Sequence, residues 1–196
     1  MSSSQQPTTN KQQSPLHSRR ILLGVSGSIA AYKAAPLVRL LVQAGAEVQV
    51  ILTEAAALFV TPLTLGTLSK KPVLTGFLRD AASGQWHNHV ELGLWAEAYV
   101  IAPASANTLG QLANGLCPNL LSAVYLSARC PVFLAPAMDL DMYAHPAVQT
   151  NIERLRSFGN RVFDSPSGAL ASGLSGPGRM LEPEQIVAEL ARFFNS

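Results

Sequence analysis

The stretch ILLGVSGSIAAYKAAPLVRLLVQAGAEVQVIL, residues 21–52, decides the fold that we predict for this chain. It begins and ends with short apolar runs, 21–25 and 46–52, which have the length and composition of buried strands. Between these runs apolar residues recur at helical spacing, at Leu37, Leu40, Leu41 and Ala44. A strand, a helix and a second strand in this order predict a parallel β-α-β unit.

The same alternation continues along the chain. Three further apolar runs, at 98–102, 131–135 and 160–163, have the composition of strands, and helical patterns lie between them. A final amphipathic segment, 183–194, is expected to be a helix that covers the sheet. Continuous apolar strands that alternate with helices are typical of a parallel sheet covered on both faces. We therefore predict a three-layer α/β fold.

Composition limits the function classes. The 196 residues are 48% hydrophobic and only 13% charged, so part of the apolar surface is expected to lie in subunit interfaces. No apolar run reaches the roughly 18 residues that a membrane span needs. Cys117 and Cys130 have no metal-ligand spacing, and two free thiols indicate a reduced, cytoplasmic protein.

Charge is unevenly distributed. Residues 1–20 contain Lys11, Arg19 and Arg20 and no acid, so the other 176 residues carry 11 basic and 12 acidic side chains. A remainder with a net charge of −1 has no basic face for nucleic acid. The first 20 residues are rich in Ser, Gln, Thr and Pro, and we expect a disordered tail before a single folded domain at 21–196.

In a parallel α/β sheet the ligand site lies where strands end and loops enter helices. The first such loop is GVSGSIAAYK, 24–33, where Gly27 permits a tight turn and Ser28, Ile29 and Ala30 open a helix. Backbone N–H groups at such a turn favour a phosphate, although turns of this kind are often only structural. The glycine spacing is not G-x-G-x-x-G, which disfavours a dinucleotide.

Two more loops offer polar groups at helix starts. The second strand ends in Thr53, Glu54 and Ala55, where the hydroxyl suits a monophosphate, the carboxylate suits a ribose hydroxyl, and Thr53 is equally suited to cap a helix. The third loop, PASANTLGQLANGLCPN at 103–119, has hydroxyl or amide groups at Ser105, Asn107 and Thr108. All three suit caps, but a run of four small polar or Ala residues exceeds what one cap needs, which favours a ligand.

The fourth loop, PAMDLDMY at 136–143, places Asp139 and Asp141 near the same sheet edge. Two carboxylates suit a metal, but no third ligand has suitable spacing, and we expect no metal site. In QWHNHVELGLW, 85–95, His87 and His89 likewise lack further ligands. A lone histidine in a loop is usually structural, yet histidine also titrates in the range that suits a general base.

Taken together, residues 21–192 resemble the flavin-containing cysteine decarboxylase family. The resemblance depends on motifs in the same order along the chain: SGSIAAYK at 26–33, TEAA at 53–56, HVELGLWAE at 89–97, PASANTLGQLANGL at 103–116, PAM at 136–138 and GPGRM at 176–180. It implies a flavodoxin-like or Rossmann-like flavoprotein. It also implies trimers or dodecamers that hold FMN at the subunit boundary.

The resemblance also implies residue roles. His89 matches the family's catalytic base, Met138 and Asp139 fall at substrate-binding positions, and Phe59 is the aromatic side chain offered across the subunit boundary. The remaining FMN contacts fall on Ser28, Ile29, Ala30, Thr53, Glu54, Ala55, Ser105, Ala106, Asn107, Thr108 and Ala137.

The reaction implied is a flavin-assisted decarboxylation. FMN oxidises the thiol of a carboxyl-terminal cysteine to a thioaldehyde, CO2 is lost, and the enethiolate is released or reduced again by the flavin. The leading candidate is conversion of 4′-phospho-N-pantothenoylcysteine to 4′-phosphopantetheine in coenzyme A biosynthesis. Two alternatives stay open: an oxidative peptidyl-cysteine decarboxylase that yields an enethiol, and a non-catalytic flavoprotein or regulatory subunit.

Two positions depart from the family pattern. Asp139 stands where the family has an asparagine that binds the substrate carboxylate, so an ionised Asp139 must be turned away, paired or protonated. Ser172 stands where the coenzyme A enzymes have a proton-donating cysteine, and a hydroxyl is a much weaker acid than a thiol. Ser175 or a water is the alternative donor. Many bacterial relatives continue into a synthetase domain, and the sequence leaves open whether one was removed here.

Overall fold

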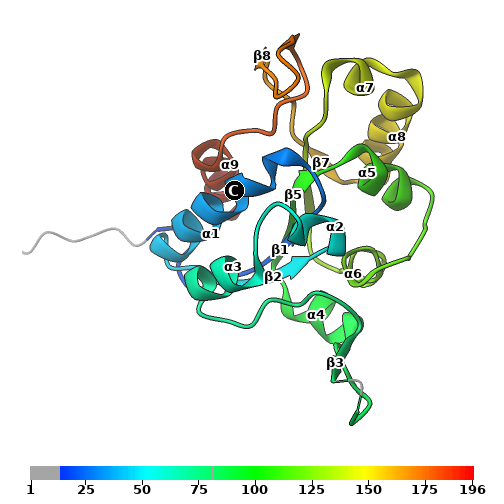
Figure 1. The fold of residues 1–196 in the computed structure, drawn as a ribbon. Helices are drawn as coiled ribbons and strands as arrows, with labels where there is room; N and C mark the ends of the chain where they lie inside the picture. The colour runs from blue at the N-terminus through cyan, green and yellow to red at the C-terminus, as the bar shows by residue number, and fades with distance from the viewer. Residues whose placement is uncertain (1–13, 81) are drawn as a thin grey trace, which may run out of the picture.

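A five-stranded parallel sheet forms the centre of the molecule (Figure 1). The structure, a computed structural model, describes residues 14–80 and 82–196. The sheet has the order β2-β1-β5-β6-β7, which is the flavodoxin-like order, and it confirms the predicted fold class. Its strands are β1 (Arg20–Val25), β2 (Glu47–Leu52), β5 (Ala98–Ala104), β6 (Val132–Pro136) and β7 (Arg161–Val162).

Helices cover both faces of the sheet, as predicted. One layer contains α1 (Ala34–Gln43), α3 (Pro62–Ser69) and α9 (Pro183–Asn195). The other contains α4 (His89–Trp95), α5 (Ala106–Ala113), α6 (Leu120–Ser127) and α8 (Pro146–Ser157). Three short helices lie in the loops after strands: the 3-10 helix η1 (Ile29–Lys33), α2 (Glu54–Ala57) and α7 (Leu140–Ala144).

Two hydrophobic cores, one on each face, account for the three layers. In β5, Val100 and Ala102 belong to the core beneath α1 and α9, whereas Tyr99 and Ile101 belong to the core beneath α5 and α6. All four side chains are fully buried, because a central parallel strand is covered on both sides. This double burial explains why the sequence shows continuous apolar runs rather than alternation.

Two antiparallel hairpins lie outside the main sheet. The first, β3 (Leu78–Asp80) with β4 (Gln85–Trp86), precedes α4. The second, β8 (Gly168–Ala169) with β9 (Ser175–Gly176), projects beside α7 at the end of the molecule where β5 and β6 finish (Figure 1). None of the helices in the described part of the chain is long and apolar enough to cross a membrane.

The folded domain begins earlier than predicted. Leu16 is fully buried in the core beneath α1, and the Ser18 N–H donates to the Gly45 carbonyl at 2.8 Å. Arg19 and Arg20 both bond to Glu97, just before β5. The expected boundary at residue 21 is therefore wrong for residues 14–20, because one apolar side chain and two arginines anchor them. The rest of the expected tail, 1–13, lies outside the described residues.

Candidate active site at the switch point of the sheet

Three hydroxyl side chains cap the helices that follow β1, β2 and β5. Ser28 Oγ accepts from the Ala30 N–H at 3.3 Å, and Thr53 Oγ1 accepts from the Ala56 N–H at 3.2 Å. Ser105 Oγ accepts from the Thr108 N–H at 3.3 Å. The structure therefore shows helix caps at Thr53 and Ser105, where the sequence suited either a cap or a ligand. Because the carboxyl ends of parallel strands meet at one edge, the caps lie together where β1 adjoins β5.

Two close approaches hold these loops in place. The buried Ser26 hydroxyl donates to the Pro103 carbonyl at 2.8 Å and accepts from the Ser105 N–H at 2.9 Å, which joins the first loop to the third. A Cβ atom on Gly27 would lie 2.6 Å from the Ala55 Cβ, a distance that real Cβ atoms do not show. Glycine at position 27 therefore allows the first and second loops to touch.

A cleft of about 610 Å³ lies between these loops. Most of the predicted flavin-contacting residues line it, namely Ser28, Thr53, Glu54, Ala55, Ser105, Ala106, Asn107, Thr108 and Ala137. Backbone N–H groups at helix starts suit a phosphate, and small side chains leave room for a planar ring. The donor set and the small-residue walls therefore fit a flavin mononucleotide. Gln111, Pro118, Asn119 and Met142 also line the cleft and were not predicted from the sequence.

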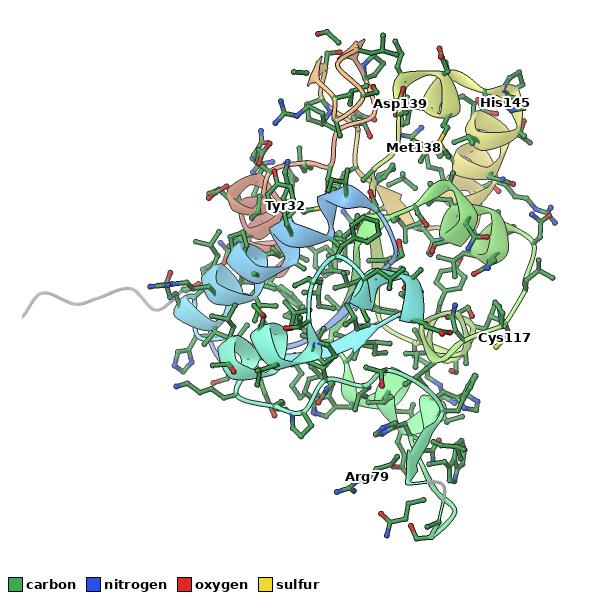
Figure 2. The ribbon with its side chains drawn as sticks, viewed as in Figure 1. Tyr32, Arg79, Cys117, Met138, Asp139 and His145 are labelled. Atoms are coloured by element: carbon green, nitrogen blue, oxygen red, sulfur yellow. The ribbon has the colours of Figure 1, made fainter. Side chains whose placement is uncertain are left out.

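A second recess, of about 480 Å³, adjoins the cleft and shares Ser28, Ala137 and Met138 with it. The predicted residues Ile29, Ala30 and Asp139 line this recess rather than the cleft. Figure 2 shows Met138 and Asp139 between α7 and the β8–β9 hairpin. The remaining walls come from η1 and from the late part of the chain, with Tyr32, Lys33, Ala169, Leu170, Ala171, Gly178, Arg179 and Met180.

The recess has a basic wall. The buried Lys33 Nζ donates to the Met180 carbonyl at 3.1 Å and to Glu182 Oε1 at 2.8 Å, and Arg179 Nη2 donates to the same oxygen at 3.1 Å. The hydrogen bond from Lys33, aided by Arg179 and opposed by partial burial, lowers the pKa of Glu182. Asp139, at the start of α7, makes no side-chain capping bond.

The GPGRM motif reaches this site through a strained glycine. Gly178 has φ +127°, and its carbonyl accepts from the Met138 N–H at 2.9 Å. A Cβ atom at Gly178 would lie 2.5 Å from the Met138 carbonyl oxygen. Only glycine allows this approach, which brings Arg179 and Asp139 into the wall of one recess.

His89, the predicted base, lies apart from the cleft of its own chain. It is the first residue of α4 rather than part of a loop, and the Asn88 side chain caps this helix. The His89 Nδ1 atom is buried and has no hydrogen-bond partner among the described residues, and the Trp86 ring lies 5.7 Å from the imidazole. His89 lines neither cavity. Burial, followed by the nearby Arg79, lowers the pKa of His87.

Phe59 and Ser172 also lie outside both cavities. Phe59 follows α2, and 46% of its surface is exposed. Ser172 lies in the exposed turn of the β8–β9 hairpin, where its Oγ accepts from the Leu174 N–H at 3.4 Å. The preceding residues, 169–171, line the recess, so Ser172 lies one residue beyond its wall.

The other reactive side chains do not gather into a further site. Within the residues that the structure describes, no group of three or more His, Cys, Asp or Glu side chains could hold a metal. Burial raises the pKa of the Cys130 thiol to about 11, so this cysteine is a poor nucleophile. Cys117 is exposed in the loop after α5.

Sequence reasoning missed Lys33, Tyr32 and Arg179 as residues of the site. Each lies inside a motif on which the resemblance depends, SGSIAAYK or GPGRM. The motifs therefore included these residues, but the sequence assigned them no role. A lysine in an otherwise apolar helix start was the available signal. Its partner Glu182 is 149 residues away, so no local pattern could reveal the pair.

Comparison with known proteins agrees with this geometry. The family described as "Flavoprotein" matches residues 9–195. A cysteine/cysteine sulfinic acid decarboxylase from an unknown prokaryotic organism is 58% identical over 136 residues, which are 69% of this chain and 38% of that protein. The coenzyme A biosynthesis bifunctional protein CoaBC of Vibrio vulnificus (strain YJ016) is 44% identical over 91% of this chain and 44% of its own. The chain thus spans less than half the length of these relatives.

Two solved structures share the fold. One is a cysteine-to-serine mutant of PPC decarboxylase complexed with pantothenoylaminoethenethiol, with a TM-score of 0.81 and 34% identity over 92% of this chain and 100% of the other. The second is the FMN-dependent cysteine decarboxylase SpaF, with a TM-score of 0.77 and 28% identity over 92% and 99% of the two chains. The family match over residues 9–195, together with the fold and the cleft, shows that this chain belongs to the flavoprotein family.

Proposed function

We propose that this protein is an FMN-dependent decarboxylase that removes the carboxylate of a cysteine-type substrate. The observation that carries the proposal is the cleft of three capped loops that opens into a recess lined by Lys33 and Arg179. The first cavity fits the cofactor, and the second offers positive charge for a carboxylate substrate. The solved FMN-dependent cysteine decarboxylase and PPC decarboxylase structures support the assignment.

The residues of the cleft bind and orient the cofactor. N–H groups at the start of α5, where Ala106 and Asn107 line the cleft, would hold the phosphate, and Ala55 and Ala137 leave space for the ring. When bound, FMN supplies a two-electron oxidation of the thiol, which makes the carbon beside the carboxylate electron-poor. The recess holds the substrate next to the cleft, because the two cavities share Ser28, Ala137 and Met138.

His89 moves the substrate proton, and we propose that it does so in the cleft of a neighbouring subunit. Its position on α4, outside both cavities of its own chain, supports this arrangement. Val90 and Leu94 on the same helix are 44% and 50% exposed, as expected for a surface that another subunit covers. Leu58 at the end of α2 and Leu63 on α3, which are 85% and 79% exposed, provide a second apolar surface.

Phosphopantothenoylcysteine is the first substrate to test. The CoaBC relative, which matches 91% of this chain, and the PPC decarboxylase structure favour it. The second candidate is free cysteine, which has the thiol that this oxidation needs and which the 58% identical relative, a cysteine/cysteine sulfinic acid decarboxylase, favours. Asp139 in the recess is the structural observation on the side of the second candidate, since a carboxylate there suits a substrate that carries an ammonium group.

The experiment is a product analysis of the purified, coloured protein. We expect heat denaturation to release FMN and not FAD, and each candidate substrate to be followed by CO2 release and by mass spectrometry of the product. Loss of 44 mass units identifies simple decarboxylation, and loss of 46 identifies the enethiol. A protein that contains FMN and releases no CO2 from any cysteine compound would be a non-catalytic flavoprotein and would overturn the proposal.

Shared active sites have a separate test. We expect His89→Asn and the cleft-blocking Asn107→Trp each to be inactive, the second because it excludes flavin. When the two variants are co-assembled, subunits with an intact cleft meet neighbours with an intact His89, and part of the activity returns. Homo-oligomers of each variant, mixed without subunit exchange, are the control. No recovery in verified mixed oligomers would place His89 in its own chain's site.

A further inference from the structure

Asp139 is a charged group without a protein partner inside the recess. It lines the recess together with Lys33 and Arg179, but among the described residues its carboxylate joins neither of them in an ion pair. Although Asp139 occupies the N-cap position of α7, its side chain makes no capping bond there. A carboxylate that is half removed from water is stabilised by a cationic or N–H partner. The recess therefore contains one acidic group that a ligand can satisfy.

The two cations of the recess are already bonded elsewhere. Both Lys33 and Arg179 donate to Glu182 Oε1, and Lys33 also donates to the Met180 carbonyl. Glu182 therefore offsets one of their two positive charges and leaves one. Arg179 uses Nη2 for this bond, and a guanidinium has further N–H donors for a second carboxylate. The recess thus presents one unmatched positive charge and one unmatched negative charge.

We propose that Asp139 binds the α-ammonium group of a free amino acid and thereby selects cysteine-type amino acids over N-acylated cysteines. The inference rests on the proposed function, since it assigns the substrate end of the same site, and it favours free cysteine, the second candidate substrate, over phosphopantothenoylcysteine, the first. A free amino acid brings an ammonium group that Asp139 attracts and a carboxylate that Arg179 attracts. An N-acylated cysteine, whether a peptide or a pantothenoyl amide, has a neutral amide there and brings only the carboxylate, which Asp139 repels.

Charge rather than size makes this selection. A recess of about 480 Å³ admits molecules larger than cysteine, so its walls alone do not exclude an acylated substrate. An acylated substrate would leave the desolvated Asp139 carboxylate without a partner or facing another carboxylate. The free-energy cost of this arrangement excludes the acylated substrate. The expected discrimination therefore depends on one side chain and disappears when its charge is removed.

The test measures binding without turnover, with the flavin-loaded full chain. S-methyl-L-cysteine and N-acetyl-S-methyl-L-cysteine differ only at the amino group, and neither has a thiol that can be oxidised. By isothermal titration calorimetry at neutral pH, we expect the first to bind about tenfold or more tightly than the second, as charge-assisted hydrogen bonds predict. In Asp139→Asn, which keeps the shape, the ratio of the two affinities should fall to about one.

Asp141→Asn is the matched control. Asp141 is an exposed residue of α7, two positions away, and it lines neither cavity. The substitution makes the same change of charge and shape, so it should leave the affinity ratio as in the unmodified protein. The flavin absorbance of all three proteins shows whether each variant is folded around its cofactor.

Three results would overturn the inference. The first is that the unmodified protein binds both ligands equally well or binds neither. The second is that Asp139→Asn leaves the ratio of the two affinities unchanged. The third is that Asp141→Asn lowers this ratio as much as Asp139→Asn does. CO2 release from cysteine compounds is measured separately. If CO2 is released from an acylated substrate and the two ligands bind equally well, the protein is still a decarboxylase, and only the proposed role of Asp139 is wrong.

Discussion

A buried imidazole nitrogen without a partner distinguishes His89 from the other histidines that the structure describes. Unpaired buried polar atoms are rare in proteins because each costs free energy. The Trp86 ring lies beside the imidazole, and the apolar side chains Val90 and Leu94 continue the same surface. Because this nitrogen is shielded while His89 as a whole is only partly buried, the rest of the imidazole is the part that a substrate in a neighbouring subunit could reach, as the proposed role of a base requires.

We predict that His89→Asn keeps its flavin and lowers the rate of decarboxylation by about a hundredfold or more, as loss of a positioned base does. Flavin absorbance and CO2 release measure the two effects. His87→Asn is the control. Burial and the nearby Arg79 lower the pKa of His87, so its imidazole is neutral at neutral pH, and we assign it no role in the reaction. Equal losses in both variants would show that the rate depends on the hairpin and not on the base.

We expect Ser172 to affect the product rather than the binding of the cofactor. Its hydroxyl lies in the turn next to the recess wall, and a hydroxyl donates a proton much less readily than a thiol. The solved cysteine-to-serine mutant of PPC decarboxylase, which holds an enethiol, shows that serine and an enethiol coexist in a related protein.

We therefore predict that the unmodified protein releases an enethiol and that Ser172→Cys shifts the product towards the saturated thiol, with flavin content unchanged. Mass spectrometry distinguishes the two products by two mass units. Ser175→Cys is the control, since Ser175 was the alternative donor. If the unmodified protein already yields only the saturated thiol, another group donates the proton.

At the scale of elements, the site depends on loops that touch. Gly27 lies so close to Ala55 that any side chain at position 27 must separate the loops after β1 and β2. We predict that Gly27→Ala lowers flavin occupancy and lowers the free energy of unfolding by about 1–3 kcal/mol, as overpacking does. Flavin content and urea unfolding measure both effects. Gly76→Ala, where a Cβ meets nothing within 4 Å, should change neither.

The bond between Glu182 and Lys33 ties the start of α9 to η1 and gives stability a pH dependence. The pKa of Glu182 is lowered in the folded protein, so this carboxylate stabilises the fold at every pH above its unfolded value of about 4.5. The contribution is lost as the pH falls through the lowered folded value. It does not change between pH 6 and 8.

We predict that Glu182→Gln lowers the free energy of unfolding at pH 7, and that the difference from the unmodified protein shrinks as the pH falls below about 4.5. Urea unfolding at several pH values measures it. Glu189→Gln, which breaks the exposed pair with Arg192, is the control and should have little effect at any pH. A difference that stays constant as the pH falls below about 4.5 and until the protein unfolds would mean that packing, and not charge, explains the loss.

At the scale of the whole molecule, large apolar side chains remain exposed around α2 and the start of α3. Leu58 and Leu63 are among the most exposed apolar side chains of the described chain, and Phe59 lies between them in sequence. Low charge in the whole sequence points to the same conclusion, that other subunits cover this surface. A cleft at such a boundary would need the assembly in order to hold its flavin.

We predict that the protein sediments as a trimer or a multiple of three, and that Leu58→Asp with Leu63→Asp dissociates it and releases the flavin. Analytical ultracentrifugation with detection at the flavin absorbance measures both. Phe158→Asp, which changes an exposed aromatic side chain at the end of α8, is the control. A monomer that keeps stoichiometric flavin would contradict the shared site.

The sequence by itself determined the order of the strands along the chain, the helices that follow them and the edge of the sheet at which the site lies. Residues 21–25, 98–102 and 131–135 are almost continuous apolar runs because their strands are covered on both faces. Such patterns are local, so each can be recognised without knowledge of the rest of the chain. The polar loops at 26–33 and 103–119 follow from the same rule.

Only the tertiary structure decided which distant groups meet. It brought Leu16 into the core, joined Lys33 to Glu182 across 149 positions, and left Asp139 without a side-chain capping bond at the start of α7. It also separated His89 from the cleft of its own chain. The physical reason is that contacts between distant residues depend on the path of the loops that connect them. Loops lack the periodic pattern of buried residues by which strands and helices are recognised in a sequence, so their path cannot be predicted from the sequence.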